Sequence, residues 1–212
     1  GVDPATGDQL YLQYELDANN ESIPVLDANG NQLTTNDWTE TERAYTGDTS
    51  VPDFIGSVAN TVSYKGFTLD LLITYGIGGS VLDNGYADLM HAGSYGNSSH
   101  PDILNAWRQP GDITNVPRLE NGNVLLVQTQ SDRFITDASF INIRNASLSY
   151  TFDSSMTEKL GLDNLTLNLT GENLYFKSKR DGLDPQFNLA GTSPANNFFA
   201  PRIISLGLNI SL

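Results

Sequence analysis

The chain has no cysteine, few basic residues, and no apolar run long enough to cross a membrane as a helix. The absence of cysteine excludes a disulfide scaffold, thiolate metal sites and a cysteine nucleophile. The 11 basic residues stand against 25 acidic ones, and the resulting net charge of -14 disfavours nucleic-acid binding because phosphates would be repelled. A spanning helix would need about 18 consecutive apolar residues, and no run approaches this. The first residues show no signal-peptide pattern, so we expect either a mature start or an internal piece.

The acidic residues are concentrated in residues 1–54. This stretch carries eleven acidic side chains and one basic side chain, Arg43. It is also rich in turn-forming residues, and Asp27 to Gly30 lie between two short apolar stretches, which predicts a small hairpin. We expect residues 1–54 to form an acidic, loop-rich hairpin region exposed to solvent, and an acidic linker is the alternative interpretation.

From residue 56 onward, apolar and polar residues alternate with the period of a β-strand. In 204–212 the even positions are all apolar and the odd positions are Ser, Gly, Asn and Ser. The same alternation occurs in 67–75, 146–152 and 165–171, whereas 58–64 is weaker because Asn60 interrupts it. The sequence therefore predicts an all-β fold with about five antiparallel strands.

The apolar faces of these strands could meet either a second protein layer or lipid. No charged residue lies on them, as expected for lipid, where one Lys or Arg at mid-bilayer costs about 2–4 kcal/mol. The opposite faces carry Ser, Thr, Asn and Gly rather than Lys and Glu, and this suits a water-filled lumen. A secreted β-sandwich that binds glycans remains the alternative, since it would show the same alternation.

The connections between these strands alternate in length. A tight turn at Lys65-Gly66 joins the first two strands, and 153–164 is short, whereas 76–133 and 177–202 are long. Outer-membrane barrels alternate short periplasmic turns with long extracellular loops in this way. Aromatic residues near the strand ends suit interfacial positions. Five strands cannot close a barrel, so the chain must be part of something larger.

Several short motifs follow one another along nearly the whole chain. They are GVDPATGD (1–8), YKGF (64–67), ILNAWRQPGD (103–112), VPRL (116–119), SDRF (131–134), DASFINIRN (137–145), LSYTF (148–152), ENL (172–174), GLDP (182–185) and the stretch from Pro201-Arg202 to Leu212. As a set, these motifs resemble the SusC-like (SusC/RagA-type) TonB-dependent outer-membrane transporters of Bacteroidetes-type bacteria.

This resemblance implies that the chain is the C-terminal part of a 22-stranded transmembrane β-barrel. Such transporters import oligosaccharides or peptides with energy from TonB, and a SusD-like surface lipoprotein caps the barrel. The plug and the TonB-binding segment lie in the N-terminal part of the family, so partners implied here include that part, TonB, the lipoprotein, the substrate and outer-membrane lipid. Family members usually end in an aromatic residue, whereas this sequence ends in Leu212.

The alternation assigns residues to the two faces of the barrel wall. Apolar residues of the last strand form the expected lipid face and barrel-insertion signal: Ile204, Leu206, Leu208, Ile210 and Leu212. Polar residues on the opposite faces form the expected lumen face: Asp70, Thr166, Asn168, Ser205 and Asn209.

Loop residues are the candidates for contact with substrate or partner, because aromatic rings stack on sugars and anchor interfaces. The candidates are Trp38, Tyr45, Tyr86, Tyr95, Trp107 and Arg108, and the competing interpretation is that each packs within its own loop. Arg108, Arg118 and Arg133 are expected to tie acidic loops together rather than to bind ligand. No constellation indicates an enzyme, a cofactor or a metal site, since His91 and His100 lack the spacing of a zinc motif.

Overall fold

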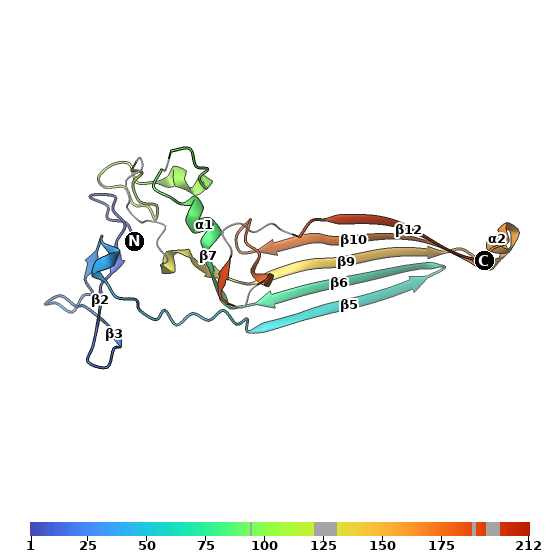
Figure 1. The fold of residues 1–212 in the computed structure, drawn as a ribbon, viewed down its shortest axis with the longest axis horizontal. Helices are drawn as coiled ribbons and strands as arrows, with labels where there is room; N and C mark the ends of the chain where they lie inside the picture. The colour runs from blue at the N-terminus through green and yellow to red at the C-terminus, as the bar shows by residue number, and fades with distance from the viewer. Residues whose placement is uncertain (94, 121–130, 188–189, 194–199) are drawn as a thin grey trace. The chain divides into compact units, whose positions relative to one another are not determined.

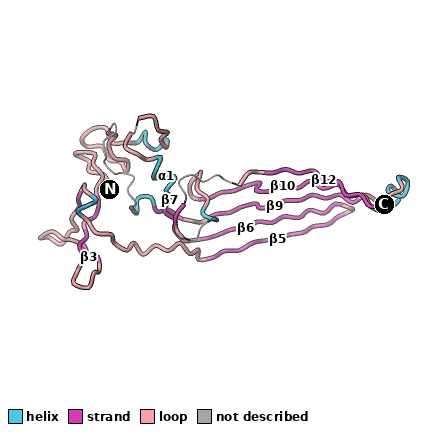
Figure 2. The backbone as a smooth tube through the Cα atoms, viewed as in Figure 1, coloured by secondary structure: helices cyan, strands magenta, loops and turns pink. Residues whose placement is uncertain are grey.

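The computed structural model describes the chain except for residues 94, 121–130, 188–189 and 194–199. It divides into two compact units, which we describe separately. One unit comprises Thr49–Leu82 and Ile135–Leu212, and the other comprises Gly1–Asp48 and Asp83–Phe134. Strands dominate the first unit, and loops dominate the second (Figure 2).

The first unit is built on one five-stranded antiparallel sheet. Its strands lie side by side in the order β12-β10-β9-β6-β5 (Figure 1). The strands are β5 (Phe54–Tyr64), β6 (Phe67–Ile77), β9 (Phe140–Thr151), β10 (Asn164–Ser178) and β12 (Ile203–Ser211). All five strands predicted from the alternation are therefore present, with longer bounds for several of them.

A tight turn at Lys65-Gly66 joins β5 to β6, as predicted. Both residues have positive φ, 47° and 82°. Two consecutive residues of this kind are characteristic of the hairpin turn whose twist matches that of the strands. At the same end of the sheet, β9 and β10 are joined by α2 (Ser154–Thr157) and η4 (Glu158–Leu160), and the chain terminates there after β12 (Figure 1).

A bulge in the middle of β9 changes the register of the sheet. Leu72 of β6 lies opposite Asn145, but the next residue, Ile73, lies opposite Ile143. Arg144 is thus the extra residue on β9, and the matching shift on β10 falls between Glu172 and Tyr175. One extra residue reverses the alternation. The apolar positions of β9 are therefore odd before Arg144 and even after it.

A second, small sheet has three strands. It consists of β7 (Ser80–Asp83), β8 (Ile135–Asp137) and β11 (Thr192–Ser193) in the order β11-β7-β8. Val81, Ala138 and Leu183 form a small buried apolar cluster. The residues that follow β10 include the 3-10 helix η5 (Pro185–Phe187).

The second unit has short elements and a compact apolar core. Its core side chains include Phe134, Met90, Val116, Ala87 and Ala106, all less than 9% exposed. Its elements are β1 (Tyr11–Leu12), β2 (Tyr14–Leu16), β3 (Ser22–Pro24), β4 (Thr34–Thr35), η1 (Trp38–Glu40), α1 (Asn84–Leu89), η2 (Pro101–Asn105) and η3 (Asp132–Phe134). β1 pairs with β4 and β2 pairs with β3.

This grouping differs from the division that the sequence suggested. Composition and alternation divide the sequence into residues 1–54 and 55–212, with 76–133 as a loop of the second part. In the structure, residues 1–48 and 83–134 form one unit. Contacts between distant segments create this unit, and local composition does not report them.

The structure does not support the alternative of a β-sandwich for the large sheet. No strand among the described residues forms a second sheet over its apolar face, and Leu206, Ile204 and Leu208 are 74%, 70% and 57% exposed. Over the residues that the structure describes, no helix is both long enough and apolar enough to cross a membrane.

Candidate functional site: the two faces of the sheet

One face of the five-stranded sheet is apolar across all five strands. The strand register aligns a row of apolar residues, one from each strand, in the order of the sheet: Val62, Leu69, Leu148, Leu169 and Leu206. Each of these five side chains is between 42% and 74% exposed. An exposed apolar surface of this extent is typical of a face that contacts another apolar phase.

The predicted lipid-face residues of β12 share this face. Ile204, Leu206, Leu208 and Ile210 lie opposite Gly171, Leu169, Leu167 and Leu165 of β10, respectively. Leu212 follows the end of β12 and is 89% exposed. At the short-turn end, Tyr150 contacts Phe67 and Phe152, with ring centroids 4.5 and 4.9 Å apart.

The opposite face carries polar side chains that bond across the strands. Its central row is Thr61, Asp70, Ser147, Thr170 and Ser205. In this row the Thr61 hydroxyl donates to Asp70 Oδ1 at 2.6 Å, and Ser147 Oγ lies 3.2 Å from Thr170 Oγ1. These bonds satisfy polar groups that water also reaches, so the face suits an aqueous surface.

The predicted lumen-face residues all lie on this polar face. Thr166 is opposite Asn209 on β12 and opposite Thr151 on β9, and the two threonine hydroxyls are 3.2 Å apart. Asn168 is opposite Gly207, one row away. The strand register thus places on one face the residues that the alternation assigns to one face: Asp70, Thr166, Asn168, Ser205 and Asn209. The register does not report which medium this face contacts.

The candidate contact residues of the loops fall into two groups. Tyr45 and Tyr95 are 89% and 97% exposed, and Trp38 begins η1 with 38% of its surface exposed. Tyr86, by contrast, donates to Asp102 Oδ2 at 2.8 Å and packs its ring against Phe134. The first group is available for contacts, whereas the Tyr86 side chain is used within its own unit.

Trp107 and Arg108 are also used internally. The Trp107 indole N–H donates to the Pro4 carbonyl oxygen at 3.0 Å, and a Cβ on Gly7 would come within 2.5 Å of the indole ring. Arg108 Nη2 donates to the Leu104 carbonyl oxygen at 3.0 Å. Trp107 therefore packs against the N-terminal segment rather than within its own loop.

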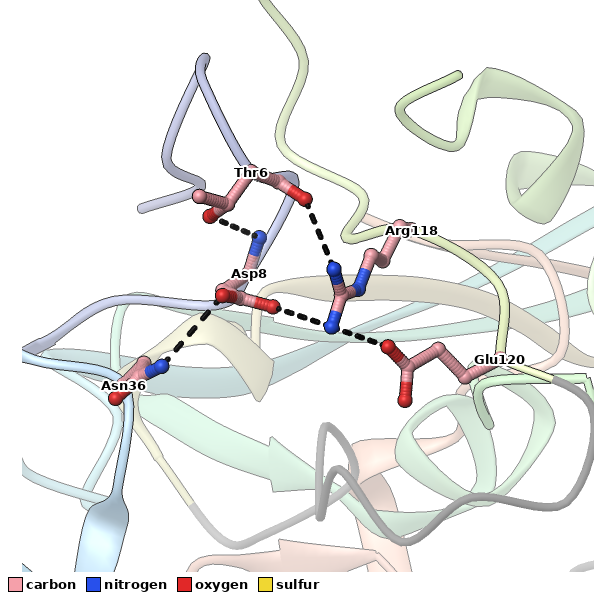
Figure 3. Close-up of polar contacts among 5 residues, drawn as sticks. All are labelled: Thr6, Asp8, Asn36, Arg118 and Glu120. Atoms are coloured by element: carbon pink, nitrogen blue, oxygen red, sulfur yellow. Dashed lines mark hydrogen bonds and ion pairs between the residues drawn. The ribbon is translucent and has the colours of Figure 1, made fainter. Parts of the chain in front are cut away.

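Arg118 joins the same N-terminal segment to residues far along the chain (Figure 3). Its guanidinium pairs with Asp8 Oδ1 at 3.1 Å and with Glu120, and its Nη1 donates to the Thr6 carbonyl oxygen at 3.3 Å. Arg133 Nη1 donates to Gln9 Oε1 at 2.9 Å, and burial lowers the pKa of the Arg133 guanidinium. These contacts are structural ties inside the unit.

Aspartates cap several turns of the chain. The backbone N–H groups of Asn31 and Asn29 donate to Asp27, and together with the Asn31 side chain they lower the pKa of that carboxyl. The backbone N–H of Glu21 is the main cause of the lowered pKa of Asp17 in the preceding turn. Among the described residues, no group of three His, Cys, Asp or Glu is placed to hold a metal ion.

A pocket of about 390 Å³ opens at the long-loop end of the sheet. It is lined by residues of β9 and β10, by the segment after β10, and by residues just before β12. The pocket cannot be recognised from the sequence alone, because its residues come from three separated segments. The basic residues around it, which include Arg144, Arg180 and Arg202, could have been noticed in a chain with so few cations.

A single-layer sheet with one apolar and one polar face has the pattern of a β-barrel wall, so the class of protein that it indicates is a β-barrel. No family model matches the sequence. The chain is 30% identical over 177 residues to "TonB-dependent receptor P3" of Formosa agariphila, covering 84% of this chain and 16% of that protein. It is 29% identical over 169 residues to "TonB-dependent receptor P39" of the same organism, covering 74% of this chain and 16% of the relative.

Solved structures show the same fold. A RagAB peptide importer in the closed-closed state matches 99% of this chain with a TM-score of 0.76 at 22% identity, and 22% of that chain is covered. A second RagAB peptide transporter structure gives a TM-score of 0.75, with the same identity and coverage. The chain belongs to the TonB-dependent transporter family, as the SusC-like resemblance of its motifs predicted, and its sheet has the fold of a segment of a large β-barrel. It spans 16% of the length of the two curated relatives.

Proposed function

We propose that this chain supplies five adjacent wall strands and their loops to an outer-membrane importer of oligosaccharides or peptides. The apolar face would contact lipid, and the polar face would line the lumen. Energy would come from TonB through parts of the transporter outside this segment, and a SusD-like lipoprotein would cap the loop end. The relatives are named as receptors and importers, which supports a transport role rather than an enzymatic one.

The continuous apolar face carries this proposal. It extends across all five strands, it bears no charge in its central rows, and no layer of the described chain covers it. Both outer strands, β5 and β12, have an unpaired edge within this sheet. Lipid would not tolerate such edges, so further strands of the same transporter would pair with them.

The loops would present the proposed extracellular contacts. Residues 1–54 and the connections 76–133 and 177–202 would lie outside the cell, with Trp38, Tyr45 and Tyr95 as the exposed aromatic candidates for substrate or lipoprotein contact. Tyr86, Trp107 and Arg108 would instead hold the loops in shape, because their polar groups bond within the unit.

Two arginine substitutions in β12 test the assignment of the faces. Leu206 and Asn209 are both exposed and lie three residues apart on opposite faces. In the full-length transporter, Leu206→Arg should greatly reduce outer-membrane assembly, since a charge on the lipid face costs about 2–4 kcal/mol at mid-bilayer. Asn209→Arg should assemble normally and alter uptake at most. Equal assembly of the two variants, measured by heat-modifiable migration in gels, would contradict the proposal.

A further inference from the structure

The pocket at the long-loop end lies on the polar face of the sheet. Asn142 of β9 and Phe176 of β10 line it, and the register places them opposite each other on that face. The segment after β10 folds back toward the sheet, where Ser178 Oγ donates to the Leu183 carbonyl oxygen at 2.6 Å. The folded-back segment and the polar face thus enclose a cavity of about 390 Å³. This volume is large enough for one sugar or amino-acid residue of a transported solute.

Basic residues are concentrated around this cavity. Four of the chain's 11 basic residues line it, whereas the chain as a whole carries a net charge of -14. Lys177 is paired with Asp181, its Nζ lying 2.8 Å from Oδ1. Within the described chain, neither Arg144 nor Arg202 forms an ion pair. The cavity therefore has an excess of positive charge.

The acidic residues that line the cavity do not cancel this excess. They are Asp181, which Lys177 already neutralises, and Asp184, which is 5% exposed. Asp184 Oδ1 accepts two hydrogen bonds, each 3.0 Å long, from the backbone and side-chain nitrogens of Gln186. Asp184 therefore stabilises the segment after β10 and is not paired with Arg144 or Arg202. These two arginines can bind another anion.

Asn142 adds an incompletely satisfied polar group. Its side chain is 3% exposed, and its Nδ2 donates to Gln186 Oε1 over a long 3.4 Å. Its Oδ1 is buried, and no described residue donates to it. A buried acceptor without a partner destabilises the protein, so a solute that donates a hydroxyl or amide hydrogen to this oxygen would relieve that penalty.

We propose that this cavity binds an anionic oxygen group, a carboxylate or sulfate, on the solute that passes along the polar face. Arg144 and Arg202 would hold the anion, and Asn142 would accept a hydrogen bond from a neighbouring donor of the solute. Guanidinium groups suit this role because they match carboxylate and sulfate oxygens with paired donors. The inference rests on the proposed function, which places this face toward the lumen, and it assigns the solute to an acidic class.

The test uses the full-length transporter in detergent, with Arg144→Gln/Arg202→Gln as the variant. Lys65→Gln/Lys159→Gln is the matched control, because it removes the same charge at the opposite end of the sheet. The probes are trigalacturonate, a sulfated trisaccharide, triglutamate, and methyl-esterified trigalacturonate as the neutral reference. We expect at least one acidic probe to bind to the wild type. The arginine variant should bind this probe with an affinity at least tenfold lower, and the affinity of the control variant should change less than twofold. The preferred probe distinguishes a uronate, a sulfated sugar and a peptide as the source of the anion.

Three outcomes would overturn the inference: no acidic probe binds more tightly than the neutral one, the arginine variant binds as the wild type does, or the control loses as much affinity as the variant. Heat-modifiable migration of the same samples separates this failure from that of the proposed function. A wild-type protein that assembles in the outer membrane but shows no dependence on the two arginines refutes the anion site alone. A wild-type protein that never assembles as a barrel refutes both.

Discussion

Ile143 of β9 lies directly opposite Ile73 of β6, although three residues later Ala146 lies opposite Leu71. The single extra residue, Arg144, is what keeps all four apolar side chains on one face. Without it, the alternation of β9 would place either Ile143 or Ala146 on the polar face. The bulge is therefore part of how this strand presents one continuous apolar surface.

Deletion of Arg144 should consequently impair barrel assembly in the full-length transporter. The deletion removes the register shift and reverses one half of β9 relative to its neighbours. We expect a large loss of heat-modifiable protein from the outer membrane. Arg144→Ala keeps the residue count and should assemble as the wild type does, and equally good assembly of the deletion variant would contradict this account of the bulge.

Gly76 on β6 provides a test of packing on the polar face. A Cβ at this position would lie 2.6 Å from the ring of Phe140, its partner on β9. Gly76→Ala should destabilise the protein by about 1–3 kcal/mol, the usual cost of overpacking. Thermal unfolding of the full-length transporter measures this cost, and adding Phe140→Ala should recover part of it. A double variant whose stability is simply the sum of both losses would show that the contact is unimportant.

Arg118 should control the order of the N-terminal segment. Its guanidinium contacts Asp8 and Glu120, and the Arg118 backbone N–H donates to the Gly7 carbonyl oxygen. Arg118→Met removes the ion pairs and should raise hydrogen exchange at residues 3–10 about tenfold, equivalent to about 1.4 kcal/mol. Arg43→Met removes the same charge elsewhere in the unit and serves as the control, and unchanged exchange at residues 3–10 in Arg118→Met would refute this role.

The turn at Asp27 should respond to acid. Its carboxylate accepts hydrogen bonds from Asn31 and Asn29, and these lower its pKa from the ordinary value of 3.8. A lowered pKa means that the turn gains stability above pH 3.8 and loses it as the pH falls through the lowered value. NMR of carboxyl-labelled aspartate should therefore show a lower titration midpoint for Asp27 in the folded protein than in denaturant. Equal midpoints in both states would contradict the capping role.

The strands were predictable because their signal is local. Alternation in 67–75 and 204–212 reports one face directly, and Lys65-Gly66 marks the hairpin turn through its chemistry. Asn60, which weakens the pattern of 58–64, lies opposite Leu71 within a regular pairing. Cross-strand pairing thus places Asn60 on the apolar face of the sheet, although its own polarity does not predict that face.

The bulge and the pocket were not predicted because they depend on long-range register. The apolar positions change from odd to even across Arg144, and this change of parity is a signal that the sequence does contain. Arg144 and Arg202 are distant in the sequence, and only the pairing of β9 and β12 with β10 brings them to one cavity. The same holds for Trp107 and Pro4, which a single hydrogen bond joins.

The most direct test asks which medium each face of β12 contacts. Ser205 and Leu206 are adjacent and point to opposite faces, and this segment contains no cysteine that would interfere with thiol labelling. Single Ser205→Cys and Leu206→Cys variants of the full-length transporter, made with any other cysteines replaced, would be labelled in intact outer membranes. We expect the Leu206→Cys variant to react with a lipid-soluble maleimide and to resist a charged one, and the Ser205→Cys variant to react with the charged reagent. Rapid reaction of the cysteine at 206 with the charged reagent would contradict a lipid-facing wall.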